Sequence, residues 1–323
     1  MLLHAYVRPR DRVLDFACGK GGDLTKYRKA EVGSYVGVDI ALESVRRDAV
    51  ERYNGGDYPF PARFVAGDCF TADLTTVFEP RAFDVVSCQF AVHYSWSTEE
   101  RARRSFRNVA KLLRPGGHFI GTTVDANVLV RKLRAADGVA FGNAIVEVRF
   151  ADAHRKKLFP TRDGPFGLRY AFTLQDAVTD CDEWLVPRKS FVALAEEYGL
   201  ELVEFRNFHE FARAKLAGED RSAFAAPGGT KDERSFSAGN KTAGKKAPAE
   251  TARDTWRQSF GGRAPEDATL SEDEWEAANL YATFAFRLAG TPESAAKAVL
   301  NRAPPGAPEK IHPRDVLVLE GAA

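Results

Sequence analysis

Residues 13–24 read VLDFACGKGGDL and place a strand, a glycine turn and a helix in direct succession. The apolar run Val13–Ala17 lacks polar alternation, which is typical of a parallel strand covered on both faces. The glycines that follow leave backbone N–H groups unshielded at the start of the helix, where the helix dipole favours anionic or electron-rich ligand groups. The segment therefore favours an α/β fold with a ligand site at the carboxyl edge of a parallel sheet.

The succession of strand and helix continues to about residue 133. Strands are predicted at Val13–Ala17, Tyr35–Ile40, Ala62–Ala66, Phe83–Gln89 and His118–Thr123. Helices are predicted at Asp23–Ala30, Leu42–Arg52 and Glu99–Leu113, the last of them ended by Arg114-Pro115-Gly116-Gly117. Strands that alternate with helices form right-handed βαβ units on one parallel sheet.

Beyond Gly138 the pattern changes. Two strands inserted into the sheet pattern are predicted at Ile145–Phe150 and Arg169–Leu174. A helix is predicted at Ser190–Tyr198, a strand at Leu200–Phe205 and a closing strand at Asn279–Phe286. Residues 212–254 hold too few large apolar groups to offset the entropy of ordering, so we expect a disordered loop there. The proline-containing tail, residues 291–323, is predicted to be flexible.

Charge and cysteine content narrow the choice of function. The 46 basic and 45 acidic residues leave a formal net charge of +1, so any surface that attracts anions must be local. No apolar run approaches the roughly 18 residues of a membrane helix. The four cysteines form no CxxC pair and no metal-like spacing with histidine. We expect a soluble intracellular protein without a metal site, and no Ser-His-Asp or Cys-His arrangement is evident.

Three acidic residues at strand ends indicate the class of ligand. Asp39 closes the second strand about twenty residues after the glycine turn, where a carboxylate can accept both hydroxyls of a ribose. Asp68 follows the third strand and can accept a hydrogen bond from an adenine amino group. Asp15 suits an ammonium or sulfonium better than a phosphate. Together they favour S-adenosylmethionine over a dinucleotide. Each acid has a simpler alternative: a strand-end residue bonded to backbone for Asp15, a helix N-cap for Asp39, and an ordinary turn aspartate for Asp68.

A second cluster, Phe90, His93 and Tyr94, follows the fourth strand. The carboxyl end of that strand faces the crevice where the reactive end of a ligand must lie. We interpret these side chains as an aromatic, hydrogen-bonding floor for a second substrate. An ordinary core or surface His-Tyr pair is the alternative.

Seven segments of the chain carry a resemblance to one family. They are CGKGGDL, GVDIA, FDVVSCQFAVHYS, LRPGGHFIGTT, FGNAIVEVRF, CDEWLVPRKSF and DEWEAANLYATFAF. Together they resemble the eukaryotic mRNA cap guanine-N7 methyltransferases, over about residues 2–211 and 271–286. The resemblance implies an α/β, Rossmann-like class I methyltransferase with a seven-stranded, mostly parallel sheet. It also implies one domain over residues 1–290, with an element that covers the cap inserted at 138–190.

The resemblance implies a set of residues that bind the methyl donor S-adenosylmethionine. Asp39 would hold the ribose, Asp68 the adenine, and Gln89 a contact near the methionine moiety, while Tyr94 would border the sulfur. The full set is Asp15, Ala17, Gly19, Asp39, Asp68, Gln89 and Tyr94.

The resemblance also implies residues that bind the cap, namely Lys20, Lys26, Arg52, Phe90, His93, Glu183 and Tyr281. The three cations would contact its ribose and phosphates, and the other four would surround the guanine. Without the resemblance, Glu183 reads as a surface acid and Tyr281 as a core residue. Guanine N7 has a lone pair and no proton to lose, so we assign no catalytic side chain and expect the rate to come from proximity and orientation.

Further expectations follow from this family. They are a 5′-capped RNA substrate, contacts with other capping or transcription proteins, no membrane, a monomer and a nuclear location. The chain departs from the family at Ala17, where glycine is usual, and at Val124, where proline is common. The basic cluster Arg131, Lys132 and Arg134 would either steer RNA phosphates or form a solvated helix face.

Two alternatives stay open at this point. One is a methyltransferase that acts on another RNA or a small molecule, and the other is a non-catalytic subunit that binds the donor or the cap. An NAD-type oxidoreductase is disfavoured by Asp15 and by the glycine spacing.

Overall fold

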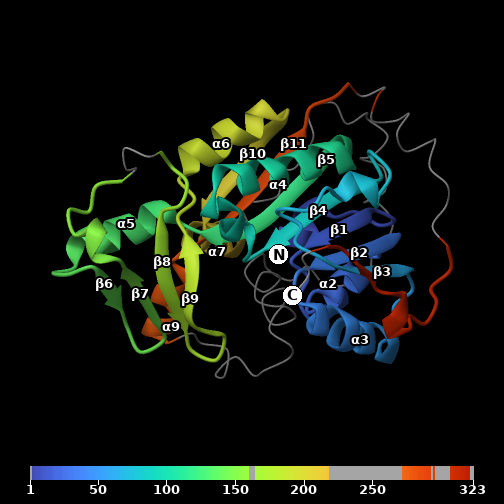
Figure 1. Ribbon diagram of the computed structural model, residues 1–323, viewed down its shortest axis with the longest axis horizontal. Coiled ribbons are helices and arrows are strands. Elements are labelled where there is room, and N and C mark those ends of the chain that lie inside the picture. The colour runs from blue at the N-terminus through green and yellow to red at the C-terminus, as the bar shows by residue number, and fades with distance from the viewer. Residues whose placement is uncertain (1, 160–163, 218–270, 292–293, 295–305, 321–323) are drawn as a thin grey trace, which may run out of the picture.

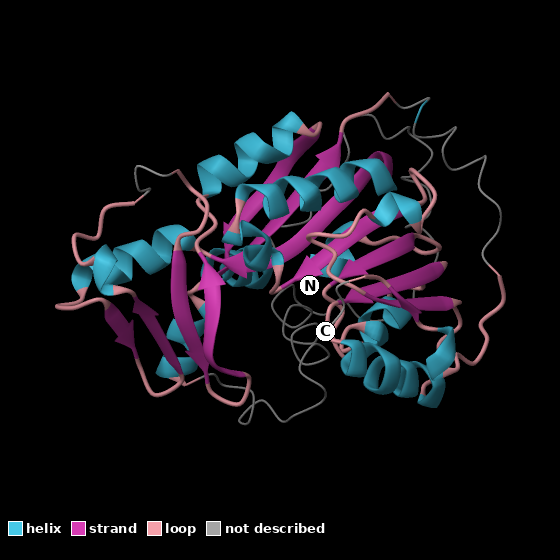
Figure 2. Cartoon of the chain, viewed as in Figure 1, coloured by secondary structure: helices cyan, strands magenta, loops and turns pink. Residues whose placement is uncertain are grey.

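The computed structural model describes residues 2–159, 164–217, 271–291, 294 and 306–320. Its main sheet has eight strands in the order β10-β11-β5-β4-β1-β2-β3-β12, and a second sheet has four antiparallel strands in the order β6-β7-β8-β9 (Figure 1). Helices cover the main sheet, and the second sheet lies at one end of it (Figure 2). The α/β fold with a mostly parallel sheet is as predicted.

The parallel half of the main sheet follows the predicted order. Its strands are β1 (Arg12–Phe16), β2 (Ser34–Asp39), β3 (Ala62–Ala66), β4 (Phe83–Gln89) and β5 (Leu113–Val124). The helical elements of this half are α1 (Leu2–Tyr6), α2 (Leu24–Lys29), η1 (Ser44–Ala49), α3 (Val50–Gly55), η2 (Leu74–Thr76), η3 (Val92–Ser97) and α4 (Glu99–Leu112). The helix predicted at Leu42–Arg52 is a π-helical turn, η1, that continues into α3.

Helices cover both faces of the main sheet. On one face α1, α2, η1 and α3 enclose a core that includes Tyr27 and Val13. On the other face α4 and α6 (Arg188–Glu197) enclose a core that includes Phe106 and Leu14. Neighbouring residues of β1 thus enter opposite cores, which explains why this strand shows no polar alternation.

The start of β5 differs from the prediction. The strand begins at Leu113, so Arg114-Pro115-Gly116-Gly117 lies within it instead of forming a separate turn. Leu113 pairs with Phe83, and the register then shifts until His118 pairs with Val85. Gly116 takes a left-handed φ of 73°. The proline and glycines therefore produce an irregular start to β5. Beyond β5, the sheet continues with two antiparallel strands, β11 (Tyr281–Leu288) and then β10 (Leu200–Asn207).

The second sheet lies within the insertion predicted at 138–190. Its strands are β6 (Ala140–Gly142), β7 (Val146–Phe150), β8 (Arg169–Leu174) and β9 (Val178–Trp184), with the short helix η4 (Asp152–His154) after β7. The sheet shares a third core with α5 (Ala126–Ala135) and with residues of α9 (Glu272–Ala278). The strand patterns seen in the sequence at 145–150 and 169–174 therefore pair with each other outside the main sheet.

The main sheet has eight strands and not the predicted seven. The additional strand, β12 (Leu317–Val318), follows η8 (Pro313–Asp315) and runs parallel to β3, with Leu317 opposite Val65. The side-chain amide of Asn54 donates to the carbonyl of Ile311 at 2.6 Å, and its oxygen accepts the Ile311 N–H at 2.9 Å. Part of the tail that the sequence predicts to be flexible therefore pairs with the main sheet.

The segment predicted to be a disordered loop, residues 212–254, overlaps a helix at its start. Residues 212–217 form the end of helix α7 (Phe208–Ala217). Residues 218–254 lie outside the described residues, so that part of the prediction is untested.

Candidate active site

The topology brings most of the predicted site residues to one edge of the main sheet. Because β1 to β4 are parallel, their carboxyl ends share this edge, with Asp39 and Gln89 as the last residues of β2 and β4. β11 runs in the opposite direction, so its first residue, Tyr281, is paired with Val124 at the carboxyl end of β5. Residues far apart in the sequence therefore meet at this edge.

The glycine turn requires a left-handed backbone. Gly19 and Gly21 have φ values of 52° and 70°, which glycine adopts without steric cost. Ala17 has a φ of 55° in the same turn. An alanine there is strained by roughly 1–2 kcal/mol, which gives a physical reason for glycine at this position in the family it resembles.

Asp39 connects the turn to the start of the next helix. Its Oδ2 accepts the Gly19 N–H at 2.7 Å, and its Oδ1 accepts the Ala41 N–H at 2.8 Å. Both contacts are to backbone, but the simpler alternative for Asp39, a helix N-cap, is not met, because the next helical element begins at Ser44 with Glu43 at its N-cap position. Each carboxylate oxygen has a further lone pair, so a ribose can still be bound.

Asp15 is buried within β1, with a relative exposure of 4%. The Tyr35 hydroxyl donates to its Oδ2 at 3.0 Å. Burial, helped by the nearby charge of Asp23, raises the pKa of Asp15 to about 7. A cationic ligand group would reverse that shift, because an opposite charge favours the ionised carboxyl.

Asp68 is held from two sides. Its Oδ1 accepts the Phe70 N–H at 2.9 Å, and its Oδ2 forms an ion pair with Arg101 on α4 at 2.8 Å. Only 8% of the residue is exposed. Arg101 was not predicted, because a charged residue in the first turns of an amphipathic helix reads as solvated.

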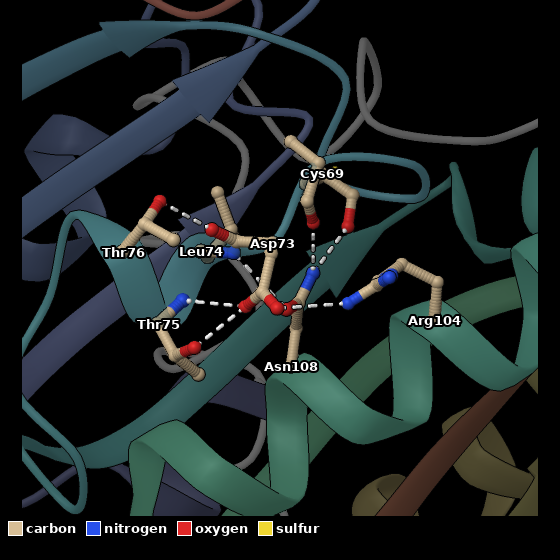
Figure 3. A network of polar contacts seen from close by, with 8 residues as sticks. Cys69, Asp73, Leu74, Thr75, Thr76, Arg104 and Asn108 are labelled. Carbon is tan, nitrogen blue, oxygen red and sulfur yellow. Dashed lines mark hydrogen bonds and ion pairs between the residues drawn. The ribbon is translucent and has the colours of Figure 1, made fainter.

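Helix α4 also fixes the loop that follows Asp68 (Figure 3). The buried Asn108 amide donates to the carbonyls of Cys69 and Ala72 at 3.0 and 2.9 Å, and its oxygen accepts the Leu74 N–H at 3.2 Å. Arg104 adds an ion pair with Asp73 at 3.0 Å. The side chains of one helix thus hold the whole loop in place.

Gln89 and Phe90 continue the edge beyond β4. The Gln89 amide donates to the Ser87 hydroxyl at 3.0 Å. Phe90 has a φ of 55°, and its N–H donates to the carbonyl and the hydroxyl of Thr122 at 3.1 and 2.8 Å. Phe90 is 47% exposed, although large apolar residues are often buried.

Three aromatic rings form one cluster at this edge. The Phe90 and Tyr281 rings lie edge to face with centroids 5.2 Å apart, and Phe208 lies 6.1 and 5.7 Å from them. Because Phe90 is exposed, part of its surface remains available to a ligand. Phe208, the first residue of α7, was not among the predicted residues.

Next to these rings lies a buried polar group. Glu183 on β9 is 5% exposed and His93 in η3 is 1% exposed, with 3.4 Å between Glu183 Oε1 and His93 Nε2. The Tyr170 hydroxyl donates to Glu183 Oε2 at 2.7 Å. Neither ring nitrogen of His93 has a hydrogen-bond partner among the described residues. The surface-acid alternative for Glu183 is therefore excluded, and the His93 ring has unused hydrogen-bonding capacity.

Tyr94 lies between His93 and strand β9. Its ring lies 4.4 Å from the His93 ring, and its hydroxyl lies 3.5 Å from the Cys181 sulfur. Burial raises the pKa of Tyr94 and that of Tyr281, so both hydroxyls remain protonated.

The three predicted cations lie apart from the aromatic cluster, on the turn and helices of one sheet face. Lys20 pairs with Asp48 at 3.2 Å and Lys26 with Asp23 at 2.5 Å, both as exposed side chains. Arg52 is exposed on α3. Among the residues that the structure describes, no recorded contact joins these cations to the rings.

The described part of the chain holds neither a cluster of metal ligands nor a membrane-length apolar helix. No group of three His, Cys, Asp or Glu side chains there could hold a metal ion. None of its helices is both long enough and apolar enough to cross a bilayer.

Comparison with known proteins assigns a family. The sequence model of one protein family, the mRNA (guanine-N(7))-methyltransferase domain, matches residues 1–289 of this chain. The mRNA cap guanine-N(7) methyltransferase 1 of Oryza sativa subsp. japonica is 45% identical over 306 residues, covering 92% of this chain and 74% of its own. The Arabidopsis thaliana protein of the same name is 44% identical over 304 residues, covering 91% and 74%.

Similarity to solved structures is weaker. An S-adenosylmethionine-dependent methyltransferase from Clostridium acetobutylicum aligns with a TM-score of 0.44 at 14% identity, covering 87% of this chain and 85% of its own. The family match and the two relatives at 44–45% identity show that the chain belongs to the mRNA (guanine-N7)-methyltransferase family.

Proposed function

We propose that this protein transfers a methyl group from S-adenosylmethionine to N7 of the guanine in a 5′ GpppN cap. The proposal is carried by one observation. A single sheet edge presents strand-end carboxylates suited to an adenosine and, beside them, a buried glutamate next to a cluster of aromatic rings in which Phe90 is exposed. Family membership supports the same reaction.

The donor would be held by the strand ends. Asp39 would accept the ribose hydroxyls and Asp68 the adenine amino group, with the backbone at Ala17 and Gly19 close to the ligand. Gln89 and Tyr94 would border the methionine moiety. The buried Asp15 carboxyl would favour its positive charge. The donor supplies an electrophilic methyl group on its sulfonium.

The guanine would lie against Phe90 and Tyr281. Glu183 is suited to accept hydrogen bonds from the guanine N1–H and amino group, and His93 can supply a further contact. Transfer of the methyl group creates a positive charge on the ring. The buried, acceptor-only carboxylate of Glu183 would stabilise that charge as it develops.

The reaction needs no general base, because N7 already carries its lone pair. The protein would accelerate it by holding the sulfonium methyl in line with N7. Lys20 and Lys26 would exchange their exposed ion pairs with Asp48 and Asp23 for contacts with the cap ribose and phosphates, of which those to phosphate oxygens are charge-assisted. Arg52, which is exposed on α3, would add a further cation.

A methyl-transfer assay tests this function. Donor labelled in its methyl group is incubated with GpppG-capped RNA, with the same RNA bearing a 5′ triphosphate, and with ApppG-capped RNA. We expect label only on the GpppG-capped RNA, at N7 after nuclease digestion. Label on uncapped RNA would indicate another substrate, and donor binding without transfer to any RNA would indicate a non-catalytic subunit.

We also propose that the protein acts in the nucleus as a monomer, in contact with other capping or transcription proteins. The names of its relatives support a role in mRNA capping. Light scattering of the purified chain tests the monomer, and imaging of a fluorescently tagged chain tests the location.

A further inference from the structure

We propose that a cleft between α5 and α6 docks an acidic, amphipathic segment of a partner protein. The cleft has a volume of about 1190 Å³. None of the proposed donor or cap residues lines it. The two helices stand on either side of the end of β9 (Figure 1).

Each helix presents one face to the cleft. Asn127, Arg131 and Arg134 line it from α5, and Arg188, Val192 and Glu196 line it from α6. Steps of three or four residues place side chains on one face of a helix. The cleft is therefore bounded along its length by two regular walls.

The floor between the walls is apolar. It is formed by side chains from separate segments, namely Val130, Phe159, Leu168, Leu185, Val192 and Leu202. Leu168 and Leu185 are almost fully buried, whereas the other four are half-buried. A volume of about 1190 Å³ exceeds the roughly 300–1000 Å³ of small-molecule sites and suits a polypeptide with apolar side chains on one face.

The rim of the cleft is basic. Arg131, Arg134, Arg188 and Lys189 line it together with a single acid, Glu196. Among the residues that the structure describes, no salt bridge is recorded for any of these four cations. Two of them make other contacts: Arg134 donates to the carbonyl of Lys157 at 3.2 Å, and the Arg188 guanidinium lies over the Phe205 ring at 4.9 Å. The rim can therefore bind the carboxylates of a partner.

The chemistry of the floor distinguishes a peptide from RNA. Sites for single-stranded RNA stack bases on aromatic rings, and among the described residues Phe159 is the one aromatic residue that lines this cleft. Its other apolar side chains are aliphatic, as in grooves that bind amphipathic helices. Lys132, the third cation of the basic cluster, pairs with Glu276 at 2.5 Å and does not line the cleft. We therefore assign Arg131 and Arg134 to a protein partner.

A defined peptide tests the proposal. The probe is a fluorescein-labelled helical peptide with leucines at positions i, i+3, i+4 and i+7 and glutamates at most other positions. A control peptide has the same composition with the leucines spread around the helix. Binding to the full chain is measured by fluorescence anisotropy. We expect the probe to bind about tenfold or more tightly than the control peptide, because only the probe can bury its leucines together.

Matched variants locate the binding surface. The double variant Arg131→Glu, Arg188→Glu should weaken probe binding by about tenfold or more, because two attractive charges become repulsive. Arg107→Glu changes an exposed cation on α4, away from the cleft, and should leave binding unchanged. Saturating GpppG should not displace the probe.

Several results would overturn the proposal. They are equal binding of the two peptides, no binding of either, and equal weakening by the cleft variant and the Arg107 variant. Displacement of the probe by an uncapped RNA oligonucleotide, with the same loss of RNA binding in the double variant, would assign the cleft to RNA instead.

Discussion

Arg101 offers a quantitative test of how the donor site is built. Its guanidinium lies 2.8 Å from Asp68, whose side chain is only 10% exposed, and Arg101 itself is 27% exposed. Replacing Arg101 with methionine keeps much of the length and removes the charge. A hydrogen bond to a charged group contributes about 1.5–3 kcal/mol, and partial exposure of Arg101 reduces this to about 1–2 kcal/mol. We therefore expect donor affinity to fall by about 5- to 30-fold.

The assay is isothermal titration calorimetry with S-adenosylhomocysteine. Arg103→Met is a control on the same helix, since Arg103 is 36% exposed and forms ion pairs with Glu99 and Glu197, outside the loop that follows Asp68. The positioning role makes a second, sharper prediction. S-inosylhomocysteine lacks the amino group that Asp68 would accept, so its affinity should change little in the Arg101 variant. Equal losses for both ligands, or equal effects of the two variants, would refute this reasoning.

Three further predictions concern ionisable groups, two in the site and one away from it. Glu183→Gln should lower kcat on GpppG about tenfold or more, while S-adenosylhomocysteine still binds. The reason is that one charge-assisted contact contributes about 1.5–3 kcal/mol. Unchanged turnover would exclude Glu183 as the guanine contact. Donor affinity should rise as the pH increases to about 7 and then level off, because the Asp15 carboxyl attracts a cation only after it has ionised, at a pKa of about 7. Asp15→Asn should abolish this pH dependence. A variant with the same pH profile as the unmodified chain would contradict the role of Asp15. Burial, with the nearby Arg114, lowers the pKa of His118 to about 4, so below about pH 6.5 the unfolded chain binds a proton that the folded chain does not. The free energy of unfolding should therefore fall between about pH 6.5 and 4, and in urea titrations His118→Phe should show a shallower fall than the unmodified chain.

The parts of the fold that were predicted correctly rest on local signals. Strand β2 and its terminal Asp39 were visible because an uninterrupted apolar run ends in an acid. The glycine turn was visible because its left-handed backbone requires glycine at Gly19 and Gly21. The geometry of a parallel sheet then places these residues at one edge without further information.

The parts that were missed depend on pairing between distant segments. β12 pairs with β3 next to Val65, and the segment before it is held by hydrogen bonds between Asn54 and Ile311, which lie more than 250 residues apart in the sequence. The prolines around β12 favoured the prediction of a flexible tail. Arg101 and Asn108 read as ordinary residues of an amphipathic helix, because nothing in the local pattern shows that a loop packs against them. Phe208 joins the aromatic cluster only because α7 begins next to β11.

The structure of the chain bound to both S-adenosylhomocysteine and GpppG tests the central claim most directly. The geometry predicts the ribose of the first ligand on Asp39 and the guanine of the second against Phe90 and Tyr281, with N7 facing the sulfur and no protein atom between them. Ligands bound on separate faces of the molecule, or a guanine that does not contact Glu183, would contradict it.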